Sequence, residues 1–227
     1  MKKLRQKLAS FYWNAVGKHR KHRYFRQKNK ERFQNWRNGF RITDLPAHPV
    51  DSRCIVVCAH PDDETLYFYS VLKQQNPFVI CMSNVGDPAR SKEFYKALDA
   101  QGVNGMMLNL PDVPHMAWAW RLFSPKALKK AAKYCPFAER IYTHSPIGES
   151  HHPHHYATGA AAKKVFSGYR ILTTAPEASP DCGGALSPED VAQKHRILKE
   201  CYPSQIKMLE TWYPWWDGYL KTEYFKE

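Results

Sequence analysis

The sequence predicts an α/β domain built around a mostly parallel β-sheet with helices on both faces. Short apolar runs of strand length alternate with longer helix-like segments from residue 53 to residue 175. Such alternation is typical of parallel sheets, in which consecutive strands are joined by crossover helices. The 227 residues are 43% hydrophobic and 14% aromatic, which suffices to bury one sizeable core.

The predicted elements follow the chain in alternating order. The apolar runs predicted to be strands are 53–59, 78–83, 105–110, 139–143 and 170–175. The predicted helices are 65–74, 91–101, 125–134 and 155–166, followed by 188–200 and 203–212. The stretch 176–188 contains proline and glycine and is predicted to be a long loop. We therefore expect a Rossmann-like sheet whose ligand sites gather at the carboxyl ends of its strands.

A basic N-terminal helical arm, 1–45, precedes the predicted α/β domain, 46–227. The first 40 residues carry 13 Lys and Arg against one acidic residue, a net charge of +12 out of +13 for the chain. Eight aromatic residues interleave with these charges, and the absence of proline favours one or two amphipathic helices. Three interpretations stay open: packing on the domain through the aromatic residues, peripheral contact with an anionic membrane, and nucleic-acid binding, which has the least support.

We expect a cytoplasmic protein, with the inner face of the membrane as the place of any peripheral contact. The longest apolar runs fall short of the ~20 residues that cross a bilayer, and the N-terminus lacks the apolar core of a signal peptide. The six cysteines include no C-x-x-C pair, and three lie in or beside predicted strands. Buried free thiols in a reducing compartment are therefore favoured over disulfides or a cysteine metal site.

A polar cluster follows the first predicted strand, where residues 54–64 read C-I-V-V-C-A-H-P-D-D-E. His60 and Asp63 are three residues apart across a turn stiffened by Pro61, so both can reach one cation. Asp62 then points elsewhere and is free to act as a base. The alternative is a polar turn whose aspartates only cap the next helix.

A second cluster follows the fourth predicted strand, where residues 149–155 read E-S-H-H-P-H-H. It precedes an alanine-rich segment that is predicted to be helical. Because the carboxyl ends of parallel strands lie at one edge of the sheet, we expect the two clusters to converge.

Both clusters resemble motifs of the PIG-L (LmbE-like) family of zinc-dependent N-acetylglucosaminyl deacetylases. Residues 59–64 match the family motif A-H-P-D-D-E in full, and residues 152–155 match H-P-D-H in three of four positions, with His154 where the family has Asp. The resemblance runs from about residue 53 to 225. It includes Asn84-Val85-Gly86-Asp87, Arg90, Glu93, Ala97-Leu98, Gly102-Val103, Leu110-Pro111-Asp112, Tyr142-Thr143-His144, Gly148-Glu149, Ser204-Gln205 and Glu223-Tyr224-Phe225.

The resemblance supports a set of three metal ligands, His60, Asp63 and His155, with a fourth position open for water. His155 is the expected third ligand because Pro153 fixes the register of the second motif. His151 and His154, which have the same three-residue spacing, are the main rival pair. Zn²⁺ is the expected metal, although such a donor set also tolerates iron, cobalt or manganese.

The resemblance also supports a division of catalytic roles. Asp62 would take the proton of the attacking water, and His152 would stabilise the oxyanion or protonate the departing amine. His152 could instead merely cap the following helix. Since a neutral His154 replaces an anion, the imidazolium form of His152 should be less favoured than in the family.

Arg90, Asp112 and Asp87 are the candidate substrate-binding residues that the resemblance implies, for sugar hydroxyls or a phosphate. Alternatively, Arg90 and Glu93 form only a surface ion pair on a helix. The expected function is removal of acetyl from an N-acetylated amino sugar of a glycan precursor or glycoconjugate. Two alternatives stay open: a metal-dependent hydrolase of another amide or ester, and a catalytically impaired carbohydrate-binding or scaffold protein.

Overall fold

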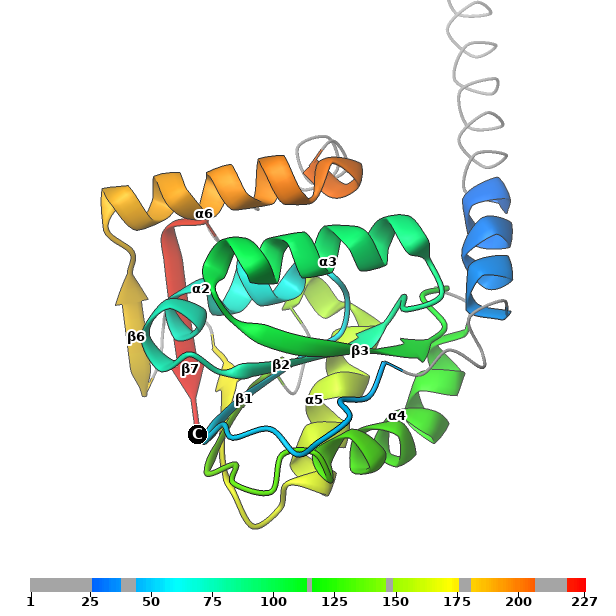
Figure 1. Ribbon diagram of the computed structural model, residues 1–227, viewed down its shortest axis with the longest axis horizontal. Helices are drawn as coiled ribbons and strands as arrows, with labels where there is room; N and C mark the ends of the chain where they lie inside the picture. Colours follow the sequence, from blue (N-terminus) through cyan, green and yellow to red (C-terminus); the bar gives the residue numbers. More distant parts are fainter. Residues whose placement is uncertain (1–25, 38–43, 114–115, 146–148, 176–180, 207–219) are drawn as a thin grey trace, which may run out of the picture.

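The computed structural model describes residues 26–37, 44–113, 116–145, 149–175, 181–206 and 220–227. Within these ranges, seven strands form one sheet in the order β3-β2-β1-β4-β5-β7-β6 (Figure 1). The strands are β1 Cys54–Cys58, β2 Phe78–Ser83, β3 Asn104–Leu110, β4 Arg140–Thr143, β5 Arg170–Thr174, β6 Cys182–Ala185 and β7 Thr222–Lys226. The first five are parallel, and β7 pairs antiparallel with both β5 and β6. The predicted mostly parallel sheet is therefore confirmed.

Helices cover both faces of the sheet, as predicted. They are α2 Asp63–Gln75, α3 Pro88–Gln101, α4 Ala117–Ala132, α5 Pro153–Val165 and α6 Pro188–Cys201. In Figure 1, α2, α3 and α6 lie on one face, and α4 and α5 lie on the other. β1 is buried throughout, and its side chains alternate between the two cores, Val56 with the first group of helices and Ile55 with the second.

Local sequence sets where these helices begin. The Asp87 side chain caps α3 by accepting from the amides of Ala89 and Arg90, and Ser187 caps α6 in the same manner. Proline occupies the first position of α3, α5 and α6, where its missing N–H is not needed. The predicted bounds therefore lie close to the observed ones for these three helices.

Two predictions need correction, and a third is only partly described. α4 begins eight positions before the predicted start at 125, and Pro125 lies inside the helix. The fully buried Trp120, whose indole Nε1 donates to Pro111 O over 2.7 Å, anchors the earlier turns and offsets the hydrogen bond that proline removes. The predicted loop 176–188 contains the strand β6, which pairs with β7. Neither of these two strands was predicted. Of the predicted helix 203–212, residues 203–206 are helical and the remainder lies outside the described residues.

The order of the strands reverses at β1. Its neighbours are β2 on one side and β4 on the other, and the chain continues outward from each of them. The connections that leave the carboxyl ends of β1 and β4 therefore diverge to opposite faces of the sheet. Such a topological switch point is where open α/β sheets bind ligands, and both polar clusters of the sequence lie there.

The end of the arm that the structure describes, residues 26–37, is a helix beside the carboxyl end of β3 (Figure 1). Its Trp36 packs against Val113, Met116 and Ala119, in agreement with the interpretation that aromatic residues dock the arm. Residues 1–25 lie outside the described ranges, and the boundary at 45 stays a prediction. Among the helices of the described segments, none is both long and apolar enough to cross a membrane.

The thiols of the six cysteines are unpaired. Five of them are buried in the sheet or under its helices, and Cys182 on the edge strand β6 is exposed. The expectation of buried free thiols thus holds for all but Cys182, whereas the cellular compartment stays a prediction.

Candidate active site

The turn after β1 and the start of α5 bring the three predicted ligands together. The backbone amide of His60 donates to Asp63 Oδ2 over 2.7 Å, which folds the turn onto itself. The same oxygen lies 3.3 Å from His60 Nδ1 and 3.4 Å from His155 Nε2. One donor atom of each of the three residues lies within 4.8 Å of the others. The two clusters therefore converge as predicted.

Two of the three separations between the donor atoms fit a tetrahedral metal ion. With zinc-to-ligand bonds of about 2.0–2.1 Å, neighbouring ligand atoms stand about 3.3 Å apart. The 3.3 Å and 3.4 Å separations around Asp63 Oδ2 match this edge. Two imidazole nitrogens and one carboxylate oxygen are also a usual donor set of catalytic zinc, with room for a fourth ligand.

Glu149 orients His155 from behind. Its Oε2 accepts from His155 Nδ1 over 2.8 Å, so Nε2 faces Asp63. Its Oε1 accepts from the Ser145 amide over 3.0 Å and from the hydroxyl of Thr174. A carboxylate on the far nitrogen of a ligating imidazole is the usual support in metal sites. Although burial alone would lower it, Asp63 and Glu149 raise the pKa of His155 to about 10, so the cluster favours positive charge at this ring.

His144 belongs to the support rather than to the ligand set. The Ala59 amide donates to its Nε2 over 3.0 Å, and its Nδ1 donates to Glu149 Oε2 over 2.6 Å. Its Nε2 also lies 3.3 Å from Asp63 Oδ2. In the tautomer with the proton on Nδ1, however, Nε2 carries no proton that it could donate to Asp63. Both ring nitrogens are thus occupied, and the buried imidazole ties β1 to the second cluster.

The rival pair of the second cluster is not brought together at one site. His151 is exposed and belongs to none of the three potential metal-binding groups that the described residues form. His154 is fully buried, hydrogen-bonded through Nδ1 to His60 Nε2 at 3.0 Å, and stacked on Trp120 with ring centroids 4.3 Å apart. Burial and the neighbouring His60 lower the pKa of His154 to about 3. His154 therefore contacts the far side of a predicted ligand as a neutral ring.

His152 lies at the start of α5, where its Nδ1 accepts from the His154 amide over 3.3 Å. Its ring centroid is 4.9 Å from that of His60 and 4.6 Å from that of His155. Burial, together with His60 and His155, lowers the pKa of His152 to about 2. The imidazolium form of His152 is therefore disfavoured, mainly by burial, and the expected difference from the family stays a prediction.

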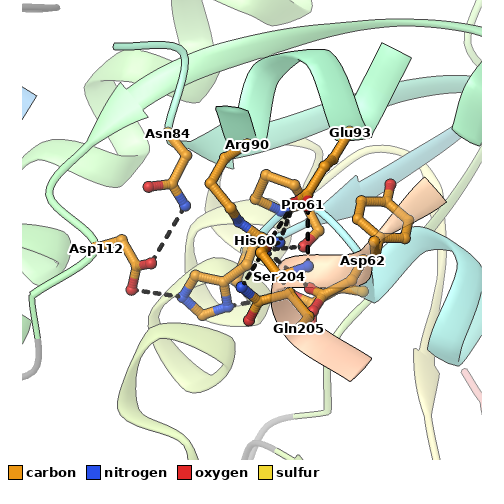
Figure 2. Close-up of polar contacts among 12 residues, drawn as sticks. His60, Pro61, Asp62, Asn84, Arg90, Glu93, Asp112, Ser204 and Gln205 are labelled. Carbon is orange, nitrogen blue, oxygen red and sulfur yellow. Dashed lines mark hydrogen bonds and ion pairs between the residues drawn. The ribbon is translucent and has the colours of Figure 1, made fainter. Parts of the chain in front are cut away.

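Asp62 stands at the turn with a positive φ of 108°, a conformation that an aspartate adopts only under strain. Its carboxylate is buried, and Arg90 Nη2 lies 3.5 Å from its Oδ1 (Figure 2). Burial raises the pKa of Asp62 well above its usual range, and Arg90 opposes this shift. The predicted base is thus held beside the ligand set.

Arg90 is buried, which contradicts the alternative that it forms only a surface pair with Glu93. Figure 2 shows its guanidinium reaching across the turn, where Nη2 donates to Pro61 O. Nη1 donates to Glu93 Oε2 over 3.0 Å and to Ser204 Oγ over 3.4 Å. Arg90 therefore fixes the turn and Asp62, and its predicted contact with substrate stays a prediction.

The other two predicted substrate residues differ in position. Asp112 Oδ1 lies 3.6 Å from His60 Nε2, and its Oδ2 accepts from Asn84 Nδ2 over 3.3 Å (Figure 2). Although burial would raise it, Arg32 and His60 hold the pKa of Asp112 well below its usual range. The Asp87 carboxylate caps α3 and accepts from Asn35 Nδ2 over 2.8 Å. Asp112 borders the ligand set, whereas the known contacts of Asp87 are structural.

Four contributors to the site had no role predicted from the sequence: Glu64, Glu149, Tyr202 and Arg32. Glu64, the last residue of the first motif, accepts from Tyr202 Oη over 2.6 Å and from the Asp62 amide over 3.0 Å, and so braces the turn. Glu149 supports His155, and Arg32 reaches Asp112 from the arm at 3.7 Å. Glu149 precedes the histidine cluster and could have been identified as its carboxylate partner, but no local signal points to Tyr202 or Arg32.

Comparisons with known proteins agree with this geometry. The sequence model of the PIG-L family, described as GlcNAc-PI de-N-acetylase, matches residues 55–166. The comparison with curated protein sequences gave no match.

Solved structures show the same fold. The zinc-inhibited form of teicoplanin deacetylase Orf2 is 17% identical with a TM-score of 0.58, covering 70% of this chain and 86% of its own. The A40926 pseudoaglycone deacetylase Dbv21 is 17% identical with a TM-score of 0.55, covering 72% and 86%. A conserved protein from Thermus thermophilus is 18% identical with a TM-score of 0.50, covering 77% and 94%. The solved structures thus show a shared fold, and the matched family model, together with both motifs of the site, shows that residues 55–166 belong to the PIG-L (LmbE-like) family.

Proposed function

We propose that this protein is a zinc-dependent hydrolase that removes the acetyl group from an N-acetylated amino sugar of a glycan precursor or glycoconjugate. The observation that supports this most strongly is the convergence of His60, Asp63 and His155 beside the buried Asp62. Membership of the PIG-L family supports the reaction class. The bond to be broken is the amide C–N bond of the acetamido group.

The residues of this chain supply the proton transfers. When bound to His60, Asp63 and His155, a zinc ion would lower the pKa of water and polarise the acetamide carbonyl. Asp62 would accept the proton of the attacking water and then deliver it to the nitrogen as the C–N bond breaks. The products are acetate and the free amino sugar, and no further reactant is needed.

We assign to His152 the stabilisation of the oxyanion. Because its Nδ1 accepts from the His154 amide, the proton of the neutral ring is on Nε2 and can be donated to the developing oxyanion. Of the two roles predicted for His152, this arrangement favours oxyanion stabilisation over proton delivery. Asp112, Arg90 and Asp87 remain the proposed substrate-binding residues, and Asp112 lies 3.6 Å from His60 Nε2, the ring nitrogen that faces away from Asp63.

The test is acetate release from N-acetylated amino sugars by the zinc-loaded protein. We expect Asp62→Asn to keep zinc and fold but to lose about 10²- to 10⁴-fold in turnover, the usual contribution of a positioned base. Asp99→Asn, the same change at an exposed position on α3, serves as the matched control and should retain activity. Equal activity of Asp62→Asn and the control would exclude Asp62 as the base.

A second candidate is a carbohydrate-binding protein that has lost catalysis. His154, which stands where the family has Asp, and the low pKa of His152 favour it. It predicts zinc and sugar binding without acetate release from any N-acetylated sugar, ester or amide tested. Acetate release that depends on Asp62 would exclude this candidate.

The proposed location is the cytoplasm, with the basic arm as a peripheral contact to anionic membranes. The proposed membrane contact rests on the charge of +12 in the first 40 residues. Of these, the helix 26–37 packs on the domain through Trp36. Cosedimentation with phosphatidylserine vesicles would test it, by comparing the full chain with a variant lacking residues 1–25. Equal sedimentation of both would contradict a membrane role for those residues.

A further inference from the structure

We infer that the helix 26–37 forms part of the wall of the active site and that its Arg32 binds an anionic group, phosphate or carboxylate, of the substrate. The inference rests on the proposed function and specifies the substrate further, as an N-acetylated amino sugar with a negative charge close to the acetamido group. It concerns a segment that precedes the residues matched by the family model, 55–166.

Three contacts hold this helix against the domain. Trp36 packs on Val113, Met116 and Ala119, and its backbone carbonyl accepts from Asn109 Nδ2 over 2.9 Å. Asn35 Nδ2 donates to Asp87 Oδ2 over 2.8 Å. Two of these contacts come from β3 and from the start of α3, which both lie at the carboxyl edge of the sheet. The helix is therefore fixed beside the site independently of Arg32.

Arg32 brings a guanidinium close to the predicted ligands. Its Nη1 lies 3.7 Å from Asp112 Oδ1, and the same oxygen lies 3.6 Å from His60 Nε2. The Arg32 side chain is 32% exposed, whereas that of Asp112 is 14% exposed. The guanidinium thus lies between a nearly buried carboxylate of the site and the solvent from which a substrate arrives.

The ion pair with Asp112 leaves the guanidinium able to bind a ligand. Its 3.7 Å separation exceeds hydrogen-bond length, so the pair is electrostatic and, among the residues that the structure describes, Asp112 does not occupy the N–H donors of Arg32. A guanidinium offers five donors in a planar fork, which matches phosphate and carboxylate in a bidentate manner. A partly exposed pair of this kind contributes little to stability, so its placement needs another explanation than holding the helix.

The charge around Arg32 has the sign that attracts an anion. The segment 26–37 contains five basic residues, Arg26, Lys28, Lys30, Arg32 and Arg37, against the single acidic Glu31. All except Arg32 are exposed. The field of such a helix raises the local concentration of anions at the entrance to the site.

The experiment measures binding of three sugars to the zinc-loaded protein by calorimetry. The sugars are N-acetylglucosamine 1-phosphate, the carboxylate-bearing N-acetylmuramic acid, and the neutral methyl glycoside of N-acetylglucosamine. The variants are Arg32→Gln and, as matched control, Lys30→Gln, which removes the same charge from an exposed position of the same helix. Zinc content and thermal unfolding are measured for each variant.

We expect wild type to bind at least one anionic sugar more tightly than the neutral one. Arg32→Gln should weaken that binding about 10- to 100-fold, the usual contribution of a charged hydrogen bond, and leave the neutral sugar, zinc content and thermal unfolding unchanged. Lys30→Gln should behave like wild type. Whether phosphate or carboxylate shows the larger loss identifies the anion.

The inference would be overturned by no preference of wild type for an anionic sugar, by no effect of Arg32→Gln, or by equal weakening of all three sugars. Stronger binding of the neutral sugar by Arg32→Gln would also contradict it, because the helix would then obstruct the site. Acetate release is measured in parallel. Anion binding through Arg32 without acetate release would refute the proposed function and leave the inference standing.

Discussion

Glu149 shows how much of the site depends on one residue that is not a predicted ligand. It joins the β4 end of the sheet to α5 by accepting from His144 Nδ1 and His155 Nδ1 over 2.6 Å and 2.8 Å. Because these two bonds hold the Nδ1 side of both rings, the Nε2 atom of His155 is directed toward Asp63. Glu149, which is not itself a predicted ligand, therefore maintains the geometry of the ligand set.

We predict that Glu149→Gln weakens zinc binding about 10- to 100-fold, the usual loss when the carboxylate partner of a ligating histidine is removed. The amide keeps the size of the side chain but cannot accept from both imidazoles with a negative charge. Zinc affinity is measured by competition with a chromophoric chelator, with the exposed Glu139→Gln as control. Unchanged affinity would show that His155 is oriented by other contacts.

At the scale of elements, α2 contains a kink that connects it to the C-terminal strand. Phe68 has the non-helical angles φ −132° and ψ 18°. The amides of Tyr69 and Ser70, just after the kink, donate to the Glu223 carboxylate over 2.9 Å and 2.8 Å. Lys194 of α6 donates to the same carboxylate over 2.6 Å, and both side chains are almost completely buried. Glu223 therefore joins α2, α6 and β7 behind the metal-binding turn.

Replacing Glu223 by Gln should destabilise the fold by about 3–5 kcal/mol, because it removes the carboxylate to which the buried Lys194 ammonium donates. Urea unfolding of the variant measures this loss. The control is Glu227→Gln, whose pair with Arg170 is more than half exposed and should contribute at most about 1 kcal/mol. A loss for Glu223→Gln as small as for the control would contradict the structural role of the pair.

Elements made by local sequence were predictable, and those made by distant contacts were not. The strand β2 matches its predicted range, and Pro88, Pro153 and Pro188 mark helix starts near the predicted ones. The strand β6 was missed because the segment C-G-G-A has little strand propensity and depends on pairing with β7. The α2 kink depends on Glu223, which is 153 residues from Ser70 in sequence.

On the scale of the whole molecule, the switch point between β1 and β4 explains why two motifs 92 residues apart, at His60 and His152, meet. The convergence was predictable because both motifs follow apolar runs of strand length, and parallel strands place such positions at one edge. Contacts between side chains of different elements were not predictable. These are the contacts of Arg90 with the turn, of Tyr202 with Glu64, and of Arg32 with Asp112. These depend on packing for which the sequence provides no periodic signal.

The proposed function depends on the binding of one metal ion by His60, Asp63 and His155 at this switch point. The most direct measurement is metal per chain by mass spectrometry on wild type, His155→Ala and His151→Ala, each expressed without metal supplementation. We expect about one zinc in wild type and in His151→Ala, whose side chain is exposed, and clearly less in His155→Ala. No metal in wild type even after reconstitution, or equal content in all three proteins, would contradict it.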